Sequence, residues 1–300
     1  MIFDTHAHYD DRAFDGDREE LLGSLLERGI GRAVNIACSL SSIRRTLELT
    51  EKYPYLYGAA GVHPTDTGEL GEENFGEIGK ALAHPKIVAL GEIGLDYHWD
   101  APERPVQKKW FERQLALARE TGMPVVLHSR DAAKDTLEMV KSAGGIELSA
   151  VMHCFSYGVE LAREYLNMGY YLGVGGVITF ANGRRLKEVV SYMPMDRLLL
   201  ETDCPYLAPV PFRGKRNSSL NLPYVVRAVA EIKGITEAEV ERITWENACR
   251  FYRLSPEGEV HDWNVGEERV CGRRSGEEVG DSEQHTGGDQ ACGQRTGEEE

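Results

Sequence analysis

Short runs of apolar and β-branched residues recur over roughly residues 1–210, and a longer segment of helical periodicity follows each of them. Short runs rich in Val and Ile suit buried strands, whereas apolar residues at intervals of three and four form one face of a helix. Strands that alternate with helices indicate βα units and a parallel sheet. The predicted strands are Ile2–His8, Ala33–Cys38, Tyr57–His63, Ile87–Glu92, Pro124–His128, Ala150–His153, Tyr170–Val177 and Leu198–Asp203.

Eight such units in about 250 residues predict a (β/α)8 TIM barrel. The alternative is an open doubly wound sheet, which normally has a Gly-rich turn after its first strand, where this chain has His6-Ala7-His8. Two further helices, Leu222–Lys233 and Glu237–Tyr252, should follow the last strand, and Thr236 with Glu239 has the pattern of a capping box. The other predicted helical segments are Glu19–Arg28, Ser42–Lys52, Val106–Thr121, Asp131–Ala143, Val159–Met168 and Gly183–Tyr192.

The chain divides into a single barrel domain, residues 1–254, and an acidic tail, residues 255–300. From Glu257 to Glu300 there are 13 Asp or Glu and 4 Lys or Arg, so this stretch carries −9 of the chain's net charge of −15. It is nearly without aliphatic residues and cannot bury enough apolar surface to offset the entropy of ordering, so we predict that it is disordered. The remaining charge (−15 less −9, or −6) neither indicates nor excludes a polyanionic substrate.

The distribution of cysteine and of apolar residues points to the cytoplasm. The six cysteines are widely spaced without a C-x-x-C pair, which argues against a disulfide framework and against a thiolate zinc site. No apolar stretch is long enough to predict a membrane span, and the first residues lack the features of a secretory signal. We therefore expect a cytoplasmic protein without membrane association or an obligate protein partner.

Potential metal ligands stand at the carboxyl ends of five predicted strands. In a barrel these ends surround one mouth, where enzymes of this fold place their active sites, so the side chains should converge. Residues two apart on a strand share a face, and apolar residues at that spacing before the ligands should fill the barrel beneath them. The predicted filling residues are Val88, Leu90, Val126, Val151 and Leu199. The predicted ligands are His6, His8, Glu92, His128, His153 and Asp203.

Six donors of this kind favour two divalent ions over one. Neutral imidazoles and carboxylates bind Zn, Mn or Mg, and six donors exceed what one tetrahedral ion with an open position needs. Glu92 can bridge two ions about 3.5–4 Å apart, which would hold the oxygens of a displacement at phosphorus and lower the pKa of bound water towards roughly 7. Asp203 can ligate and also accept a proton, so it is the candidate to orient that water. We therefore predict Glu92 and Asp203 as catalytic residues.

At these residues the chain resembles the TatD family of metal-dependent deoxyribonucleases, within the amidohydrolase-like barrels. The resemblance spans roughly residues 2–252. It implies a TIM barrel, a cytoplasmic location, the same six metal-binding residues with Glu92 shared between two ions, and hydrolysis of DNA phosphodiesters, commonly as a 3′-to-5′ exonuclease. The matching segments are FDTHAH (3–8), GVHP (61–64), GEIGLDY (91–97), LHSRDA (127–132), MHCFS (152–156), GVGGVITF (173–180) and ETDCPYLAP (201–209).

The resemblance also implies that His63 and Arg130 line the substrate pocket. His63 ends the third predicted strand, where it could donate to a phosphate oxygen or merely stack beside Pro64. Arg130 lies two residues beyond His128. It could bind phosphate, or it could hold a carboxylate, Glu201 or Asp96, in place.

A basic segment after the last strand is a further candidate for substrate binding. Arg213, Lys215 and Arg216 could contact phosphates, or they could form only a surface charge cluster. In the family this segment usually continues Asn-Glu-Pro. Here Ser218-Ser219-Leu220 follows Asn217 instead, which leaves the fit of the substrate open.

These observations predict a deoxyribonuclease whose partner is DNA, with RNA as a further substrate. Two alternatives stay open. The same activated water could attack a carbonyl carbon, which would make the protein an amide or ester hydrolase such as an aminoacyl-tRNA deacylase. A protein that retains metal and holds nucleic acid without cutting it is the other alternative, and the complete ligand set argues against it.

Overall fold

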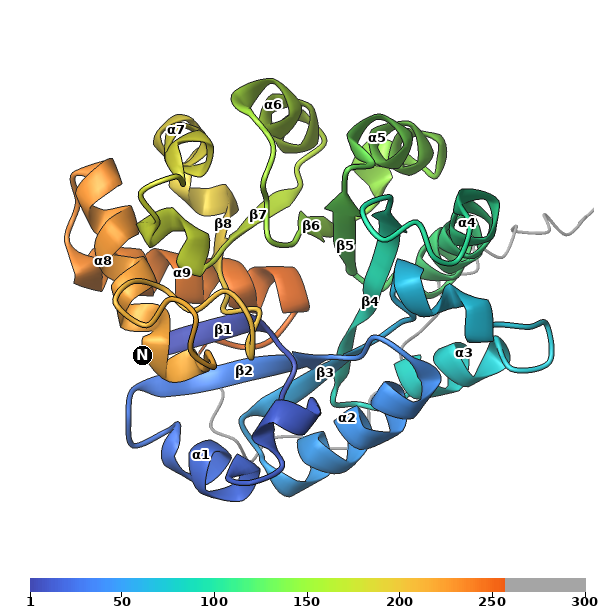
Figure 1. Cartoon of the computed structure of the whole chain (residues 1–300), viewed down its shortest axis with the longest axis horizontal. Coiled ribbons are helices and arrows are strands. Elements are labelled where there is room, and N and C mark those ends of the chain that lie inside the picture. The colour runs from blue at the N-terminus through green and yellow to red at the C-terminus, as the bar shows by residue number, and fades with distance from the viewer. Residues whose placement is uncertain (257–300) are drawn as a thin grey trace, which may run out of the picture. The chain divides into compact units, whose positions relative to one another are not determined.

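Eight parallel strands pair in sequence order to form a barrel (Figure 1). The computed structural model describes residues 1–256, so the predicted tail, residues 255–300, lies almost entirely outside the described residues. Backbone hydrogen bonds join the end of the first strand to the segment that follows the last strand, from Asp203 N to His6 O (2.9 Å) and from His8 N to Cys204 O (2.8 Å). The predicted TIM barrel is confirmed. Its strands are β1 (Ile2–Ala7), β2 (Ile30–Ile36), β3 (Leu56–Ala60), β4 (Ile87–Asp96), β5 (Val125–Arg130), β6 (Ala150–Met152), β7 (Tyr171–Val174) and β8 (Leu198–Leu200).

The helices surround the strands (Figure 1). Every predicted helix is present with ends that differ by a few residues, and a further short helix, which contains two glycines, precedes β4. Except at the end of the last helix, the helices bury their apolar faces against the outside of the barrel, in the larger of the two apolar clusters of residues 1–256. The helices are α1 (Arg18–Ser24), α2 (Leu40–Lys52), α3 (Gly76–Leu82), α4 (Arg104–Thr121), α5 (Ala133–Ser142), α6 (Val159–Asn167), α7 (Arg184–Tyr192), α8 (Leu222–Lys233) and α9 (Glu237–Tyr252).

The last helix, α9, begins at the predicted capping box and ends beneath the barrel. Thr236 Oγ1 accepts from Glu239 N (3.2 Å), and the Glu239 carboxylate accepts from Thr236 N (2.9 Å). At the other end of the helix, Phe251 packs against Tyr171 at the start of β7, and Tyr252 packs against Phe3 at the start of β1. The aromatic end of α9 therefore covers the amino-terminal opening of the barrel.

A separate apolar cluster fills the barrel interior under the mouth. Val88, Val126, Val151 and Leu199 belong to it, as predicted. Leu90 does not, because it packs in the outer cluster between the sheet and the helices, while Ala89 points inward. The strict alternation expected along β4 is wrong at this point, since the pairing register shifts between β3 and β4 and again between Leu90 and Ile93. Each such irregularity moves the following side chains to the opposite face.

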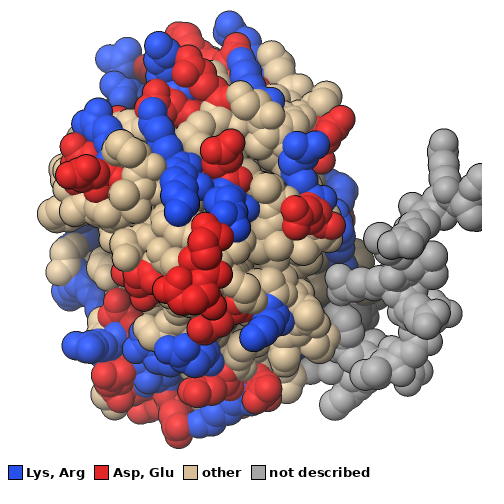
Figure 2. Space-filling view, turned by 90° about the vertical axis from the view of Figure 1, so that its right-hand side faces the viewer, with Lys and Arg blue, Asp and Glu red and all other residues tan. Residues whose placement is uncertain are grey.

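The outer surface mixes charges of both signs. Figure 2 shows Asp and Glu interspersed with Lys and Arg over the side that lies at the right of Figure 1. Ion pairs such as Arg113–Glu72 (2.9 Å) and Lys108–Asp135 (2.5 Å) link neighbouring elements. Within residues 1–256, no helix is both long enough and apolar enough to cross a membrane.

Candidate metal centre

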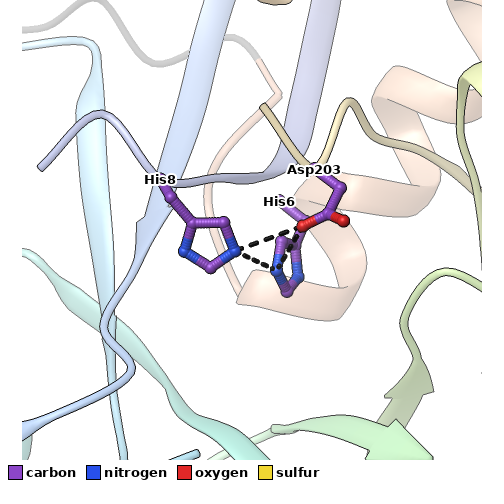
Figure 3. Close-up of side chains that lie close together, drawn as sticks. All are labelled: His6, His8 and Asp203. Atoms are coloured by element: carbon purple, nitrogen blue, oxygen red, sulfur yellow. Dashed lines mark hydrogen bonds and ion pairs between the residues drawn. The ribbon is translucent and has the colours of Figure 1, made fainter. Parts of the chain in front are cut away.

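The three ligand candidates from β1 and the loop after β8 lie in one group. His6 lies in β1, His8 directly follows β1, and Asp203 lies shortly after β8. The Nε2 atoms of His6 and His8 are 3.1 Å apart, and Asp203 Oδ1 lies 3.2 Å from His8 Nε2 and 3.8 Å from His6 Nε2 (Figure 3). One cation could be held between these three side chains.

Glu92 separates this group from a second group of histidines. Its Oε2 atom faces the first group, 3.4 Å from His6 Nε2 and 3.9 Å from His8 Nε2. Its Oε1 atom faces the other way. The distances from Oε1 are 2.7 Å to His128 Nδ1, 3.4 Å to His153 Nε2 and 3.8 Å to His63 Nε2. The structure therefore brings all six predicted ligands together and adds His63 to them.

Local backbone features place these carboxylates and histidines. The irregular register of β4 turns Glu92 into the mouth, although Leu90 two residues earlier faces outward. Gly94 follows with φ +150°, and a Cβ at this position would lie 1.9 Å from the carbonyl oxygen of His128. Glycine at position 94 therefore allows β4 to approach β5 beside a ligand, which no larger residue would allow.

A layer of polar partners orients the histidines from behind. His128 Nε2 bonds to Asp96 Oδ2 (3.0 Å), and His8 Nδ1 bonds to the carbonyl oxygen of Ile36 (2.8 Å). Glu201 Oε1 lies 3.4 Å from His153 Nδ1 and accepts a hydrogen bond from Cys154 N (2.6 Å). Such partners fix the ring orientation and direct the other ring nitrogen toward a metal. From the sequence, Asp96 and Glu201 were suggested only as partners of Arg130. In the structure they serve the histidines instead.

Asp4 ties the two ligand-bearing segments of the first group together. Its buried carboxylate accepts from His6 N (3.2 Å) and from Thr202 N (3.0 Å). It also accepts from the hydroxyls of Thr202 (2.7 Å) and Ser219 (2.6 Å). Ser219, part of the segment that departs from the family pattern, thus has a defined partner next to the ligand-bearing segments. Sequence reasoning gave no role to Asp4, because two of its three partners, Thr202 and Ser219, are about 200 residues away.

Burial and charge set the protonation of the six candidate ligands, which we call the cage: His6, His8, Glu92, His128, His153 and Asp203. Burial alone would raise the pKa of Glu92, but the charge of His153 and the hydrogen bonds from His128 and His6 hold it well below its usual range. Burial alone would lower the pKa of His153, yet the neighbouring carboxylates of Glu92, Glu201 and Asp203 raise it to about 9. Burial and the neighbouring His128 lower the pKa of His63 to about 3, so His63 is neutral at pH 7.

The donor set fits divalent metal ions. Glu92 and Glu201 are almost fully buried, and no Lys or Arg of residues 1–256 forms an ion pair with them or with Asp203. Buried carboxylates are costly unless a charge compensates them. The only compensating groups among the described residues are imidazoles, which are themselves metal ligands. Imidazole and carboxylate donors together suit Zn and related transition metals, and also Mn.

The predicted substrate-binding residues differ in whether their side chains already pair with other residues of the chain. Arg130 is exposed at the end of β5 and forms no ion pair within the described part of the chain. Its guanidinium lies 6.0 Å from the ring centre of Trp99. Of the basic segment, Arg213 packs over Phe180 at 4.4 Å, and Lys215 is exposed. Arg216, by contrast, donates to the Asp17 carboxylate (2.6 and 2.5 Å) and to Ala13 O (2.7 Å).

The contact between His128 and Asp96 leads to a first prediction. Asp96→Asn should weaken metal binding by about 10- to 100-fold, because the amide is a poorer acceptor for the ring N–H of His128 than the carboxylate is. Titration of the metal-free protein with Zn or Mn, followed by calorimetry, measures the change. Asp196→Asn, in the ion pair with Arg197 before β8, is the matched control and should leave metal affinity unchanged. Equal affinities of Asp96→Asn and wild-type protein would contradict the orienting role.

A TIM barrel that gathers buried histidines and carboxylates at its carboxyl-terminal mouth is the architecture of a metal-dependent hydrolase. The comparisons with known proteins place the chain within this class. It belongs to the family described as TatD related DNase, whose model matches residues 3–253. The resemblance noted from the sequence motifs is confirmed.

Individual relatives cover most of the chain. It is 43% identical over 255 residues to an uncharacterized metal-dependent hydrolase, YabD, of Bacillus subtilis, covering 85% of this chain and 100% of the relative. It is 33% identical over 257 residues to a protein of Cronobacter sakazakii named 3′-5′ ssDNA/RNA exonuclease TatD, covering 84% and 97%. Among solved structures, the TatD homologue YjjV of Escherichia coli matches with a TM-score of 0.80 and 30% identity, covering 85% and 98%.

Proposed function

We propose that this metal-dependent hydrolase cleaves phosphodiester bonds in DNA as a 3′-to-5′ exonuclease. The division of contacts at Glu92 carries the proposal. One of its oxygens faces the group of His6 and His8, and the other faces the group of His128, His153 and His63. A carboxylate that serves both groups suits two ions held side by side, which is the arrangement used for displacement at phosphorus. The name of the Cronobacter relative supports the same substrate class.

When bound, two divalent ions would activate water and neutralise charge on the phosphate. His6, His8 and Asp203 would hold one ion, and His128 and His153 the other, with Glu92 shared between them. The Asp203 carboxylate is the least buried of the cage carboxylates, with 17% of its side chain exposed against 4% for Glu92. It can therefore reach both a ligand position and the solvent of the mouth, and we assign it the role of accepting a proton from the attacking water.

The chain's own cations would hold the substrate. Arg130, Arg213 and Lys215 have no carboxylate partner among residues 1–256 and can bind phosphate oxygens. Arg216 forms an ion pair with Asp17, so we expect it to hold the basic segment in place rather than to bind substrate. His63 is neutral and bonded through Nδ1 to Thr65, which leaves Nε2 pointing at the cage. The cytoplasmic location and the absence of an obligate partner remain predictions.

Digestion of a single-stranded oligodeoxynucleotide by the full-length protein tests the proposal. A 5′-end label should give a ladder that shortens from the 3′ end. EDTA should abolish the release of nucleotides, and adding back Mg, Mn or Zn should restore it. A parallel RNA substrate and a panel of ester and amide substrates measure selectivity. Metal-dependent cleavage of an ester or amide, without release of nucleotides under any of the three metals, would refute the nuclease.

A further inference from the structure

Exposed apolar side chains gather on two loops at the mouth of the barrel. Eight large apolar residues are exposed among residues 1–256, and four of them lie on the loops after β4 and β8. The four are Trp99, Tyr206, Leu207 and Val210. Trp99 has 65% of its surface exposed, the largest fraction among the aromatic side chains of this set. Exposed apolar groups that cluster around a site commonly mark a binding surface.

The loop that carries Trp99 is fixed to the metal centre. Asp96 Oδ1 accepts hydrogen bonds from His98 N (2.9 Å) and from Trp99 N (3.2 Å). The other oxygen of the same carboxylate, Oδ2, bonds to His128 Nε2 (3.0 Å). One carboxylate thus orients a metal-ligand candidate and anchors the backbone of Trp99. The indole is held beside the cage, yet its ring faces solvent.

A cation without an ion-pair partner accompanies this indole. The Arg130 guanidinium carbon lies 6.0 Å from the ring centre of Trp99. Arg130 forms no ion pair with any residue that the structure describes. A flat aromatic face beside a cation matches the two parts of a nucleotide, because the base stacks on the ring and the phosphate pairs with the guanidinium.

A second exposed aromatic side chain stands on the opposite rim. Tyr206 N bonds to the Asp203 carbonyl oxygen (2.8 Å), and Tyr206 Oη donates to Asp11 Oδ2 (3.1 Å). In the order β1 to β8, three strands separate β4 from β8 in either direction around the barrel. Trp99 and Tyr206 therefore flank the cage from opposite sides. Tyr206 is 55% exposed.

We propose that Trp99 is a stacking platform for a nucleobase of a single-stranded substrate, with Tyr206 as a second platform across the mouth. The proposal rests on the proposed nuclease function and specifies its substrate class. A base inside a duplex is stacked on both faces and paired at its edge, so only an unpaired strand or a frayed end offers a free face. The burial of the cage below the rim, with His6 1% and Glu92 3% exposed, also requires a strand that can bend into the mouth.

Kinetics with two matched substrates tests the platform. One is a single-stranded oligonucleotide, and the other has the same length but carries abasic sugars near its 3′ end. Trp99→Ala should lower kcat/KM for the base-bearing substrate by about tenfold or more, and the loss should be confined to that substrate. Trp99→Phe should recover most of the activity. Tyr192→Ala, which removes an exposed aromatic ring at the end of α7, is the control and should match the wild type.

A binding measurement keeps the test independent of turnover. In EDTA, fluorescence anisotropy of a labelled single-stranded oligonucleotide should show about tenfold weaker binding to Trp99→Ala, with little change for the abasic strand. Equal affinity of the variant and the wild type would overturn the platform, whether or not the protein hydrolyses DNA. Equal kinetic losses on both substrates would overturn it as well, since they would show that Trp99 acts only by supporting Asp96. Base-dependent binding without any hydrolysis would uphold the platform and refute the nuclease.

Discussion

Replacing Glu92 with Gln is expected to lower kcat/KM for single-stranded DNA by about 10³-fold or more, with the fold retained. The amide keeps the size of the side chain but removes the negative charge, and it cannot offer two equivalent oxygens to two ions. Both groups of histidines would then lose the anionic side chain that they share. Steady-state kinetics measures the loss, and metal analysis should show fewer ions bound per chain than in the wild type.

The control for this variant is Glu112→Gln on the exposed face of α4, on the outside of the barrel. Both variants should give the circular dichroism spectrum of the wild type. The less conservative Glu92→Ala should behave like Glu92→Gln in activity and should still fold, because the interior apolar cluster lies beneath the cage and does not include Glu92. Wild-type turnover in either Glu92 variant would refute the bridging role.

The barrel and the convergence of the six candidate ligands could be predicted because each depends on local patterns. Strand-like runs separated by helical periods define the βα units, and the ligands lie at the end of the runs. The prediction of Leu90 as barrel filling was wrong, because alternation holds only where the register is regular. The irregular register of β4 also positions the site, because the same segment carries Glu92 into the mouth while Leu90 packs against the helices.

Partners that act across the barrel could not be assigned from the sequence. Asp96 meets His128, and Glu201 meets His153, across adjacent or nearby strands whose spacing in the chain has no periodic signal. A polar residue on the inner face of a strand, where the neighbours are apolar, was the available signal for both. Arg216 illustrates the opposite case. Its position in a basic segment predicted phosphate binding, whereas its contact with Asp17, about 200 residues earlier, is visible only in the folded chain.

The left-handed backbone of Asp203 guides the choice of variant for the proposed proton acceptor. Asp203 has φ +54° and is held by a hydrogen bond from its N–H to His6 O (2.9 Å). Asn adopts this conformation far more readily than Ala, which would add backbone strain to the loss of the carboxylate. Asp203→Asn therefore isolates the chemistry, whereas Asp203→Ala would also disturb the loop after β8.

Asp203→Asn should lower kcat for DNA hydrolysis by about 10²- to 10⁴-fold, the range expected when a positioned proton acceptor is lost. Burial alone would raise the pKa of Asp203, but the hydrogen bond from His8 and the charge of His153 keep it below its usual range, so the wild-type carboxylate is charged at neutral pH. This variant weakens one predicted ligand, but Glu92 and the histidines are unchanged and the amide oxygen can still ligate, so metal should remain bound at saturating concentration, in contrast to Glu92→Gln. Single-turnover kinetics at saturating metal separates the chemical step from metal loss. A rate that recovers fully at high metal concentration would assign Asp203 to metal binding alone and contradict its role as proton acceptor.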